Sequence, residues 1–317
     1  MSPESKNNSI LDEQRKLASR KHCLWQRARM VQAIRQFFIE QDYLEVDTPQ
    51  LVSELAPEIH IDALYADKRY LHTSPELCMK RLLAAGYPKI FQFSKCFRDG
   101  ERGNLHLPEF TLLEWYRTGI DYKVLMEECE ALILFVAQNL GVRQKIIYQE
   151  MEIDLKSPWE KIPVSKAFDR YASLTLQTAI EKACFDEIIV KEIEPHLGLN
   201  RPIFLYDFPA PMASLARLKP DNPELAERFE IYLAGLELAN GFSELIDAQE
   251  QRARFERDRR HRHDSGKLVY LMPERFLKSL EQMPEAAGIA LGVDRLAMIF
   301  TDSLKIDDVV SFTPEEV

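Results

Sequence analysis

The most informative segment for the fold is residues 89–117, KIFQFSKCFRDGERGNLHLPEFTLLEWYR. The stretch consists of two extended arms joined by a polar loop, residues 99–108, which is rich in turn-forming and charged residues. In the first arm, phenylalanines alternate with polar residues, which is the period-two pattern of a half-buried strand. We therefore predict a β-hairpin.

The second arm carries an unusual set of side chains on one face. Because alternate residues of a strand point to the same side, Phe110, Glu114 and Tyr116 share that face. Arg98 and a loop holding His106 would lie nearby. An aromatic plate, a carboxylate and a phenol together favour a binding site, and the plain alternative is an amphipathic hairpin with a solvated loop.

Composition and charge restrict the class of protein. The 317 residues are 46% hydrophobic and 29% charged, as in a globular protein of one or two domains, and no run of eighteen apolar residues predicts a membrane span. No charged-then-apolar leader opens the chain, so we expect a cytoplasmic location. The net charge of −10 argues against a large RNA-binding surface. The five cysteines form no C-x-x-C pair, which argues against disulfides and structural zinc.

The N-terminal part predicts an arm, a helix and a strand in turn. Residues 1–20 are polar and charged, and we expect a loose arm there. Apolar residues over 27–41 follow helical spacing, and a strand over 44–46 then ends at Pro49. Helical spacing returns over residues 124–140.

Residues 70–82, YLHTSPELCMKRL, predict a strand, a turn and a helix that begins near Glu76. Ser74 suits the N-cap and Pro75 the first helical position. The plain interpretation is that Ser74 and Glu76 only cap the helix. Residues 142–200 mix helix-like runs with loops, and we expect a helical insertion that packs beside the sheet without chemistry of its own.

Residues 229–245, FEIYLAGLELANGFSEL, predict a second hairpin with a two-residue turn at 234–235. Tyr232 would then pair with Glu237, and Glu230 would be a diagonal neighbour of Glu237 on the same face. Two facing carboxylates repel unless a cation lies between them, and oxygen ligands of this kind suit Mg²⁺ with phosphate. The alternative is two solvent-facing glutamates. The charged helix over residues 252–263 is best interpreted as a solvated face, although it holds a possible basic patch.

GIALGVDRLAMIF, near the C-terminus, predicts a strand that runs into a helix at Val293. Gly288, Ala290 and Gly292 share a strand face, and such small residues let a ligand approach the backbone closely. Arg295 lies in the first turn of the helix, where the helix dipole disfavours a cation, so a bound anion is the natural explanation.

Three segments in this order resemble motifs 1, 2 and 3 of class II aminoacyl-tRNA synthetases, closest to the lysyl enzymes: residues 27–50, 89–117 and 286–300. The resemblance implies an α+β catalytic domain over residues 21–317, with a mainly antiparallel sheet flanked by helices. Motif 1 implies a homodimer. Fewer than thirty residues precede the motif 1 helix in this sequence, so we expect no counterpart of the anticodon-binding OB domain that precedes motif 1 in lysyl-tRNA synthetases.

The resemblance also assigns residues to ligands. It implies an ATP site at Arg98, Glu101, His106, Phe110, Glu237, Leu238, Gly292 and Arg295. It implies a lysine pocket at Ser74, Pro75, Glu76, Glu114, Tyr116, Asn240, Glu244 and Ala290. Arg98 and Arg295 are the expected catalytic residues, acting on the phosphates, while Glu230 and Glu237 hold Mg²⁺.

Glu244 matches the family residue that pairs with the side-chain ammonium of lysine. Simple alternation does not place it on the face of Glu237, seven positions away, so we predict a β-bulge at Asn240-Gly241.

The chain departs from the lysyl enzymes at several positions. FRDGE replaces FRNE, so Gly100 stands where a glutamate is usual, and whether Glu101 substitutes is open; Leu107 replaces an asparagine. Ala290 replaces a glycine, and one methyl group in a tight pocket is worth roughly 1–3 kcal/mol of discrimination. We therefore expect a lysine-like ligand that is not placed as α-lysine is.

These features together resemble the elongation factor P lysyl-ligase family, whose members activate (R)-β-lysine with ATP and transfer it to a lysine side chain of elongation factor P. An acidic chain without an anticodon domain fits a protein acceptor better than tRNA. Two alternatives stay open. One is a minimal α-lysine synthetase or another class II amide-forming ligase, and the other is a catalytically inactive synthetase-like regulator.

Overall fold

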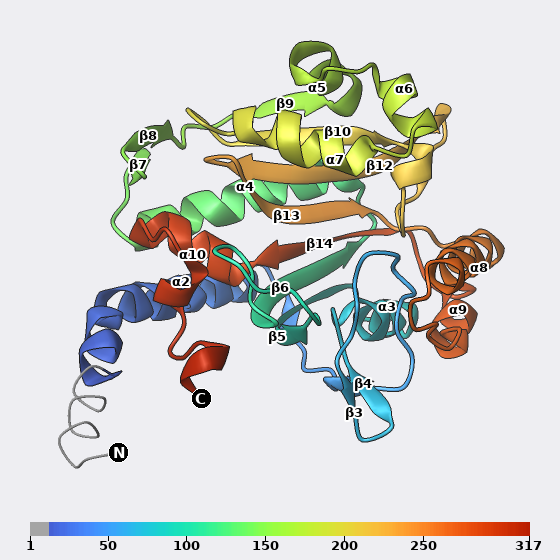
Figure 1. Ribbon diagram of the computed structural model, residues 1–317, viewed down its shortest axis with the longest axis horizontal. Helices are drawn as coiled ribbons and strands as arrows, with labels where there is room; N and C mark the ends of the chain where they lie inside the picture. The colour runs from blue at the N-terminus through green and yellow to red at the C-terminus, as the bar shows by residue number, and fades with distance from the viewer. Residues whose placement is uncertain (1–12) are drawn as a thin grey trace.

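The computed structural model describes residues 13–317 and is built around one nine-stranded sheet (Figure 1). In spatial order its strands are β1 (Leu44–Glu45), β5 (Lys89–Phe97), β6 (Glu109–Thr118), β14 (Ala286–Gly292), β13 (Leu236–Ser243), β12 (Asn222–Leu233), β10 (Ile203–Pro209) and β9 (Glu160–Pro163), and β11 (Leu218–Lys219) pairs with β12. Only β1–β5 and β10–β9, at the two ends, are parallel pairs. The predicted α+β fold with a mainly antiparallel sheet is confirmed.

The remaining elements cover or extend this sheet. The helices are α2 (Lys21–Glu40), α3 (Glu76–Ala84), α4 (Tyr122–Asn139), α5 (Val164–Tyr171), α6 (Leu176–Glu181), α7 (Phe185–Ile188), α8 (Ala248–Asp264), α9 (Glu274–Leu280) and α10 (Val293–Thr301). The small strands are β2 (Leu51–Val52), β3 (Tyr65–Ala66) and β4 (Arg69–Leu71) in one sheet and β7 (Lys145–Tyr148) and β8 (Met151–Asp154) in another. Short 3-10 or π turns are η1 (Ile189–Ile193), η2 (Glu194–His196), η3 (Ala210–Met212), η4 (Ile306–Val309) and η5 (Pro314–Glu316). None of the three sheets in the described chain is a separate five-stranded barrel.

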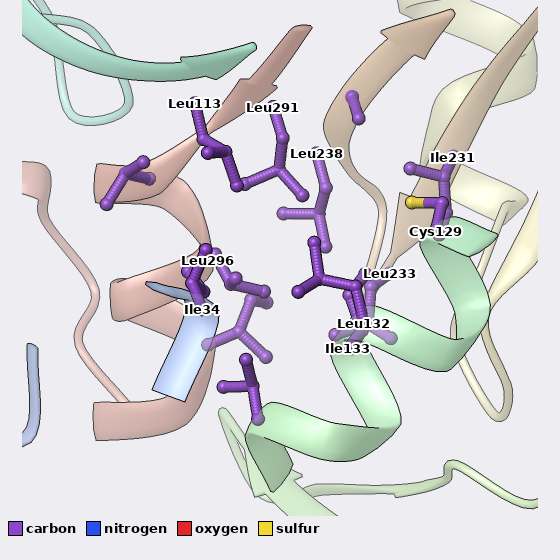
Figure 2. Close-up of a cluster of buried hydrophobic side chains, with 14 of the residues drawn as sticks. Ile34, Leu113, Cys129, Leu132, Ile133, Ile231, Leu233, Leu238, Leu291 and Leu296 are labelled. Carbon is purple, nitrogen blue, oxygen red and sulfur yellow. The ribbon is translucent and has the colours of Figure 1, made fainter. Parts of the chain in front are cut away.

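The largest core lies between one face of the sheet and helices α2, α4 and α10 (Figure 2). Ile34 of α2, Ile133 of α4 and Leu296 of α10 pack there against sheet residues that include Leu113 and Leu291. Helices α3, α8 and α9 stand beside the other face (Figure 1). The helical spacing over residues 27–41 and 124–140 therefore predicted buried stripes correctly, although α2 begins six residues earlier.

The first predicted hairpin exists as β5 and β6, but its first strand is buried on both faces rather than half-buried. Phe91 lies in the main core, and Gln92 and Ser94 on the opposite side are buried as well. The reason is a long-range contact: His72, after β4, covers this side and lies 3.0 Å from Ser94 Oγ. A period-two pattern shows only that polar and apolar side chains alternate. In this strand the polar side faces a polar part of the protein interior and not solvent.

The second predicted hairpin is β12–β13, with its turn at Ala234 and Gly235. Both residues have positive φ, +54° and +74°, as a type I′ turn requires. Tyr232 lies opposite Glu237, as predicted.

The predicted bulge also exists, but at Leu238 and not at Asn240-Gly241, because the register shifts between the pairs Ile231–Ala239 and Tyr232–Glu237. Gly241 instead allows the Phe229 ring to pack closely against the backbone of β13. A Cβ on Gly241 would lie 2.6 Å from the ring of Phe229.

Two segments differ from their predicted description. The segment 142–200 is not purely helical, since it contributes the β7–β8 hairpin and strand β9, which extends the main sheet beside β10. The predicted loose arm lies largely outside the described residues, and its described part, residues 13–19, is helical.

Helix α8 is not simply a solvated charged helix. Arg254 and Arg262 are buried, and they donate hydrogen bonds to backbone carbonyls of neighbouring loops. The two arginines are buried because they satisfy loop carbonyl groups that accept no hydrogen bond within a helix or strand.

One buried carboxylate joins the three motifs. Asp294 in the first turn of α10 accepts hydrogen bonds from Arg27 of α2, at 2.7 Å, and from the backbone N–H of Thr111 in β6, at 2.7 Å. Arg27 also donates to the Thr111 hydroxyl at 3.0 Å. Among the helices of residues 13–317, none is long and apolar enough to cross a membrane.

Gly241→Ala tests the close packing of the two β-strands. The new methyl group would overlap the Phe229 ring, so we expect the free energy of unfolding to fall by about 1–3 kcal/mol. Gly103→Ala is the matched control, because a Cβ there meets nothing within 4 Å and the change should be close to neutral. Urea unfolding measures both, and equal stabilities of the two variants would contradict the packing argument.

Candidate functional site

A cavity of about 600 Å³ lies on the sheet face opposite α2, α4 and α10. Its floor is formed by strands β6, β13 and β14, and its walls include α3, α8 and the loop between β5 and β6. The volume suits a small-molecule ligand. The predicted residues that line it are Ser74, Glu76, Arg98, Glu101, His106, Phe110, Glu114, Tyr116, Glu237, Leu238, Asn240, Ala290, Gly292 and Arg295. Pro75, Glu230 and Glu244 do not.

At one end of the cavity, which we call the carboxylate end, Glu114 is fully buried and held by two hydroxyl groups. Ser74 Oγ donates to it at 2.6 Å and Tyr116 Oη at 2.7 Å. Burial, with the nearby Glu76 carboxylate, raises the pKa of Glu114 to about 7. This carboxylate is therefore positioned by other side chains and is costly to ionise without a cation.

Helix α3 begins at Glu76, as predicted, but the cap residues are shifted by one position. Pro75 occupies the N-cap, not the first helical position, so its role is structural. Ser74 still acts as a cap, because its hydroxyl accepts the Glu76 N–H at 3.0 Å while donating to Glu114. The capping and site interpretations of Ser74 both apply.

Behind the cavity wall, Lys80 lies between two carboxylates that the family resemblance assigns to the substrate. Its Nζ is 2.5 Å from Glu76 Oε1 and 2.5 Å from Glu244 Oε2, and the lysine is fully buried. Glu244 does not itself line the cavity, and its cationic partner in this structure is Lys80. The spacing of Glu76 and Lys80, four residues apart on a helix, is the signal by which the sequence could have shown this pair.

Glu244 remains poorly satisfied. Neither of its oxygens accepts a well-directed hydrogen bond from the described residues, although Lys80 is close. Burial, opposed by Lys80 and helped by the neighbouring carboxylates Glu76 and Glu114, raises the pKa of Glu244 to about 8. Three carboxylates share one lysine at this end, so a cationic ligand would compensate the remaining negative charge.

The small-residue face of β14 is used by the protein itself. A Cβ at Gly288 would lie 2.2 Å from the Tyr116 ring and 2.7 Å from Glu244 Oε1, so this glycine makes room for both side chains. Ala290, which lies opposite Glu114 and Asn240, reaches the cavity.

At the other end of the cavity, which we call the arginine end, Arg98 stacks on Phe110 with 5.0 Å between guanidinium carbon and ring centroid. Its Nε is buried without a hydrogen-bond partner among the described residues, and its nearest carboxylate oxygen, from Glu101, is 3.8 Å away. An incompletely paired arginine of this kind suits an anion. Gly100 has φ +75°, so the substitution of glycine here fits the turn that the loop makes.

Arg295 occupies the first turn of α10, as predicted. It donates to the Glu237 carbonyl at 2.8 Å and to His106 Nε2 at 2.6 Å. Burial and the arginine lower the pKa of His106, so the imidazole is neutral and accepts this bond. Leu238 contributes only backbone to the cavity, because its side chain points into the core (Figure 2).

The donor set for Mg²⁺ fits in part. The pairing of Tyr232 with Glu237 puts Glu237 on the face of Glu230. Burial, together with the Glu237 charge, raises the pKa of Glu230 to about 7. The Glu237 carboxylate accepts no hydrogen bond from the described residues, and its nearest cation is Arg295, with Nη1 3.6 Å from Oε2. Glu230, by contrast, accepts hydrogen bonds from Arg228 and Tyr232 at 2.6 Å each. No group of three or more potential ligands occurs within residues 13–317, so phosphate oxygens would have to complete the coordination.

Sequence reasoning missed several residues of the cavity. Arg228 lines it and would have been found by parity, since it lies two positions before Glu230 on the same strand. Glu58 and Asp258 also line it, from a loop and from α8, and no local pattern marks them. The segment 142–200 contributes Asp186 to the lining, so it is not without a part in the site.

Comparison with known proteins agrees with this geometry. Residues 5–316 match the family described as tRNA synthetases class II (D, K and N). Proteins named elongation factor P–(R)-β-lysine ligase are similar over nearly the whole chain. The protein from Proteus mirabilis is 41% identical over 306 residues, covering 91% of this chain and 94% of its own length. The corresponding figures for Vibrio cholerae are 40% over 307 residues, 91% and 94%.

The chain belongs to the elongation factor P–(R)-β-lysine ligase family. Membership makes it a ligase built on the class II synthetase catalytic domain, which confirms the enzyme class that the three motifs predict. It also explains why one cavity joins a carboxylate end to an arginine end.

Glu244→Gln tests the raised pKa at the carboxylate end. Because the pKa of Glu244 is raised to about 8 in the folded chain, and an unfolded glutamate titrates near 4.3, the folded state keeps a proton that the unfolded state has lost. Without ligand, this group's stabilising contribution is complete below about pH 4 and is lost as the pH rises through 8.

We expect Glu244→Gln to reduce the fall in unfolding free energy between pH 5.5 and 7.5 by about 1 kcal/mol per pH unit. Urea unfolding at several pH values measures the slope. Glu281→Gln, an exposed position outside the cavity, should leave the slope unchanged. Identical slopes for wild type and Glu244→Gln would contradict the assignment.

Proposed function

We propose that this chain uses ATP and Mg²⁺ to activate (R)-β-lysine, or lysine, as an aminoacyl-adenylate and transfers it to a lysine side chain of elongation factor P. The observation that carries the proposal is the charge distribution of the cavity. Glu76, Glu114 and Glu244 share only Lys80 at the carboxylate end, which suits a ligand with two ammonium groups.

The arginine end supports the nucleotide half of the proposal. Arg98 and Arg295 would neutralise the phosphates while the substrate carboxylate attacks the α-phosphorus, with His106 held beside Arg295. Phe110 would support the adenine ring on the face that Arg98 leaves open. Glu237, with Glu230 behind it, would hold Mg²⁺, which supplies further neutralisation of phosphate charge. Positioning and charge stabilisation account for this chemistry without a protein nucleophile.

Elongation factor P as the acceptor is supported by the names of the relatives and by the net charge of −10. An acidic chain without a separate barrel in its described part offers little for tRNA binding. A tRNA charging assay separates this proposal from a minimal lysyl-tRNA synthetase.

We also propose that the chain is a homodimer through its motif 1 elements. Helix α2 exposes Trp25 and Ile39 at 63% and 58%, and the adjacent edge strand β1 exposes Leu44 at 50%. Trp25→Asp should convert a dimer to a monomer in light scattering at micromolar concentration. Val190→Asp, an equally exposed apolar position on η1, should leave the mass unchanged. A monomeric wild type would contradict the proposal.

Amino-acid-dependent ATP–pyrophosphate exchange tests the activity itself. We expect exchange with (R)-β-lysine to exceed exchange with α-lysine, because the Ala290 methyl group narrows the cavity beside Glu114. Ala290→Gly should shift the preference toward α-lysine by roughly tenfold.

The other outcomes are equally informative. Preference for α-lysine in both proteins would contradict the role of Ala290 and favour a minimal synthetase. Absence of exchange with either amino acid would contradict the proposed activation step and favour the inactive regulator.

A further inference from the structure

The transfer step poses a chemical problem that the assigned residues do not solve. A lysine side chain is an ammonium ion near neutral pH, with a pKa of about 10.4, whereas only the neutral amine attacks a carbonyl carbon. Glu114 has both oxygens occupied by hydroxyl donors, and Glu76 is paired with Lys80. Glu244 does not line the cavity. None of these three carboxylates is therefore available to accept the proton.

Glu58 lies in the cavity and is not engaged elsewhere. Its carboxylate accepts no hydrogen bond from any residue in the described chain. The charged groups that act on it come from four surrounding elements: Arg98 at the end of β5, Glu76 on α3, Asp258 on α8 and Glu101 in the loop between β5 and β6. Two of these residues belong to the expected ligand sites, Arg98 to the ATP site and Glu76 to the lysine pocket, and both line the cavity with Glu58.

The backbone at Glu58 is fixed from α8. The fully buried Arg262 donates to the Glu58 carbonyl at 2.6 Å and to the Ile61 carbonyl at 3.0 Å. Lys267, just beyond the helix, donates to the Ile59 carbonyl at 3.1 Å. These contacts hold a loop without regular structure against the cavity, as a proton acceptor in a defined position requires.

We propose that Glu58 accepts the proton of the attacking lysine ammonium in the transfer step, an inference that rests on the proposed function. One N–H proton passes to the Glu58 carboxylate, and the neutral amine attacks the carbonyl carbon of the adenylate. A C–N bond forms, the C–O bond to phosphate breaks, and AMP leaves with that electron pair. The second proton of the new amide nitrogen goes to water, as does the first when Glu58 is regenerated.

The protonation behaviour of Glu58 agrees with this role. Burial, opposed by Arg98 and helped by the three neighbouring carboxylates, raises the pKa of Glu58 to about 7. A general base works best when its pKa is near the working pH. Transfer should therefore slow as the pH falls below about 7, since Glu58 is then protonated.

The test separates the two half-reactions of the full-length enzyme. In Glu58→Gln, we expect transfer to the acceptor protein to fall about 100-fold more than pyrophosphate exchange, and the limb of the pH profile near 7 to disappear. Hydroxylamine, which is uncharged near neutral pH and needs no base, should react with the adenylate at similar rates in both proteins. Glu58→Asp should recover part of the transfer.

Glu54→Gln is the matched control, since this glutamate belongs to the same loop and does not line the cavity. Its exchange and transfer should match those of the wild type. Equal losses of exchange and transfer in Glu58→Gln, or an unchanged transfer rate, would overturn the assignment of Glu58. Absence of exchange and hydroxamate formation in the wild type would instead contradict the proposed function.

Discussion

The buried Asp294 carboxylate is the contact on which the arrangement of the site depends. It receives a guanidinium from α2 and a backbone N–H from β6, so it fixes three segments that are far apart in sequence. Its chain neighbour is Arg295, and the neighbour of its partner Thr111 is Phe110. The same ion pair therefore sets the distance between the two residues expected to hold opposite parts of a nucleotide. Removing one partner from such a buried pair typically costs 3–5 kcal/mol, because a charge is left without compensation.

The cavity is built at a cost in electrostatic energy. Glu114 and Glu244 are buried far from water, and one lysine serves them and Glu76 together. Burial of a carboxylate without a full counter-charge raises its pKa and makes its ionised form expensive. The free chain therefore loses stability as the pH rises and these carboxylates ionise. A diammonium ligand would compensate two of the negative charges at once. The proposed specificity for such a ligand would follow from the same charge deficit that destabilises the free chain.

Local patterns predicted the elements of the fold because they depend on neighbours in sequence. The turn at Ala234-Gly235 and the start of α10 at Val293 follow from turn chemistry and from the change of period. The position of the bulge did not follow, because Gly241 was free to serve either a bulge or the packing of Phe229, and only the tertiary contact decides. For the same reason, residues of the three motifs were identified, whereas Glu58 and Asp258 were not: they reach the cavity through loop placement that no periodicity encodes.

Helix α8 shows why a charged sequence need not be a solvated one. Arg254 donates to the carbonyls of Ser214 and Ala216, and Arg262 to those of Glu58 and Ile61. Backbone carbonyls outside helices and strands still need donors when they are buried, and a guanidinium with five N–H groups can satisfy several at once. The two arginines, about two helical turns apart, thus fix the loops on two sides of the cavity to one rigid element. Neither arginine is assigned a contact with a ligand. Through them, helix α8 nevertheless determines where the cavity walls lie, and with them the position of Glu58.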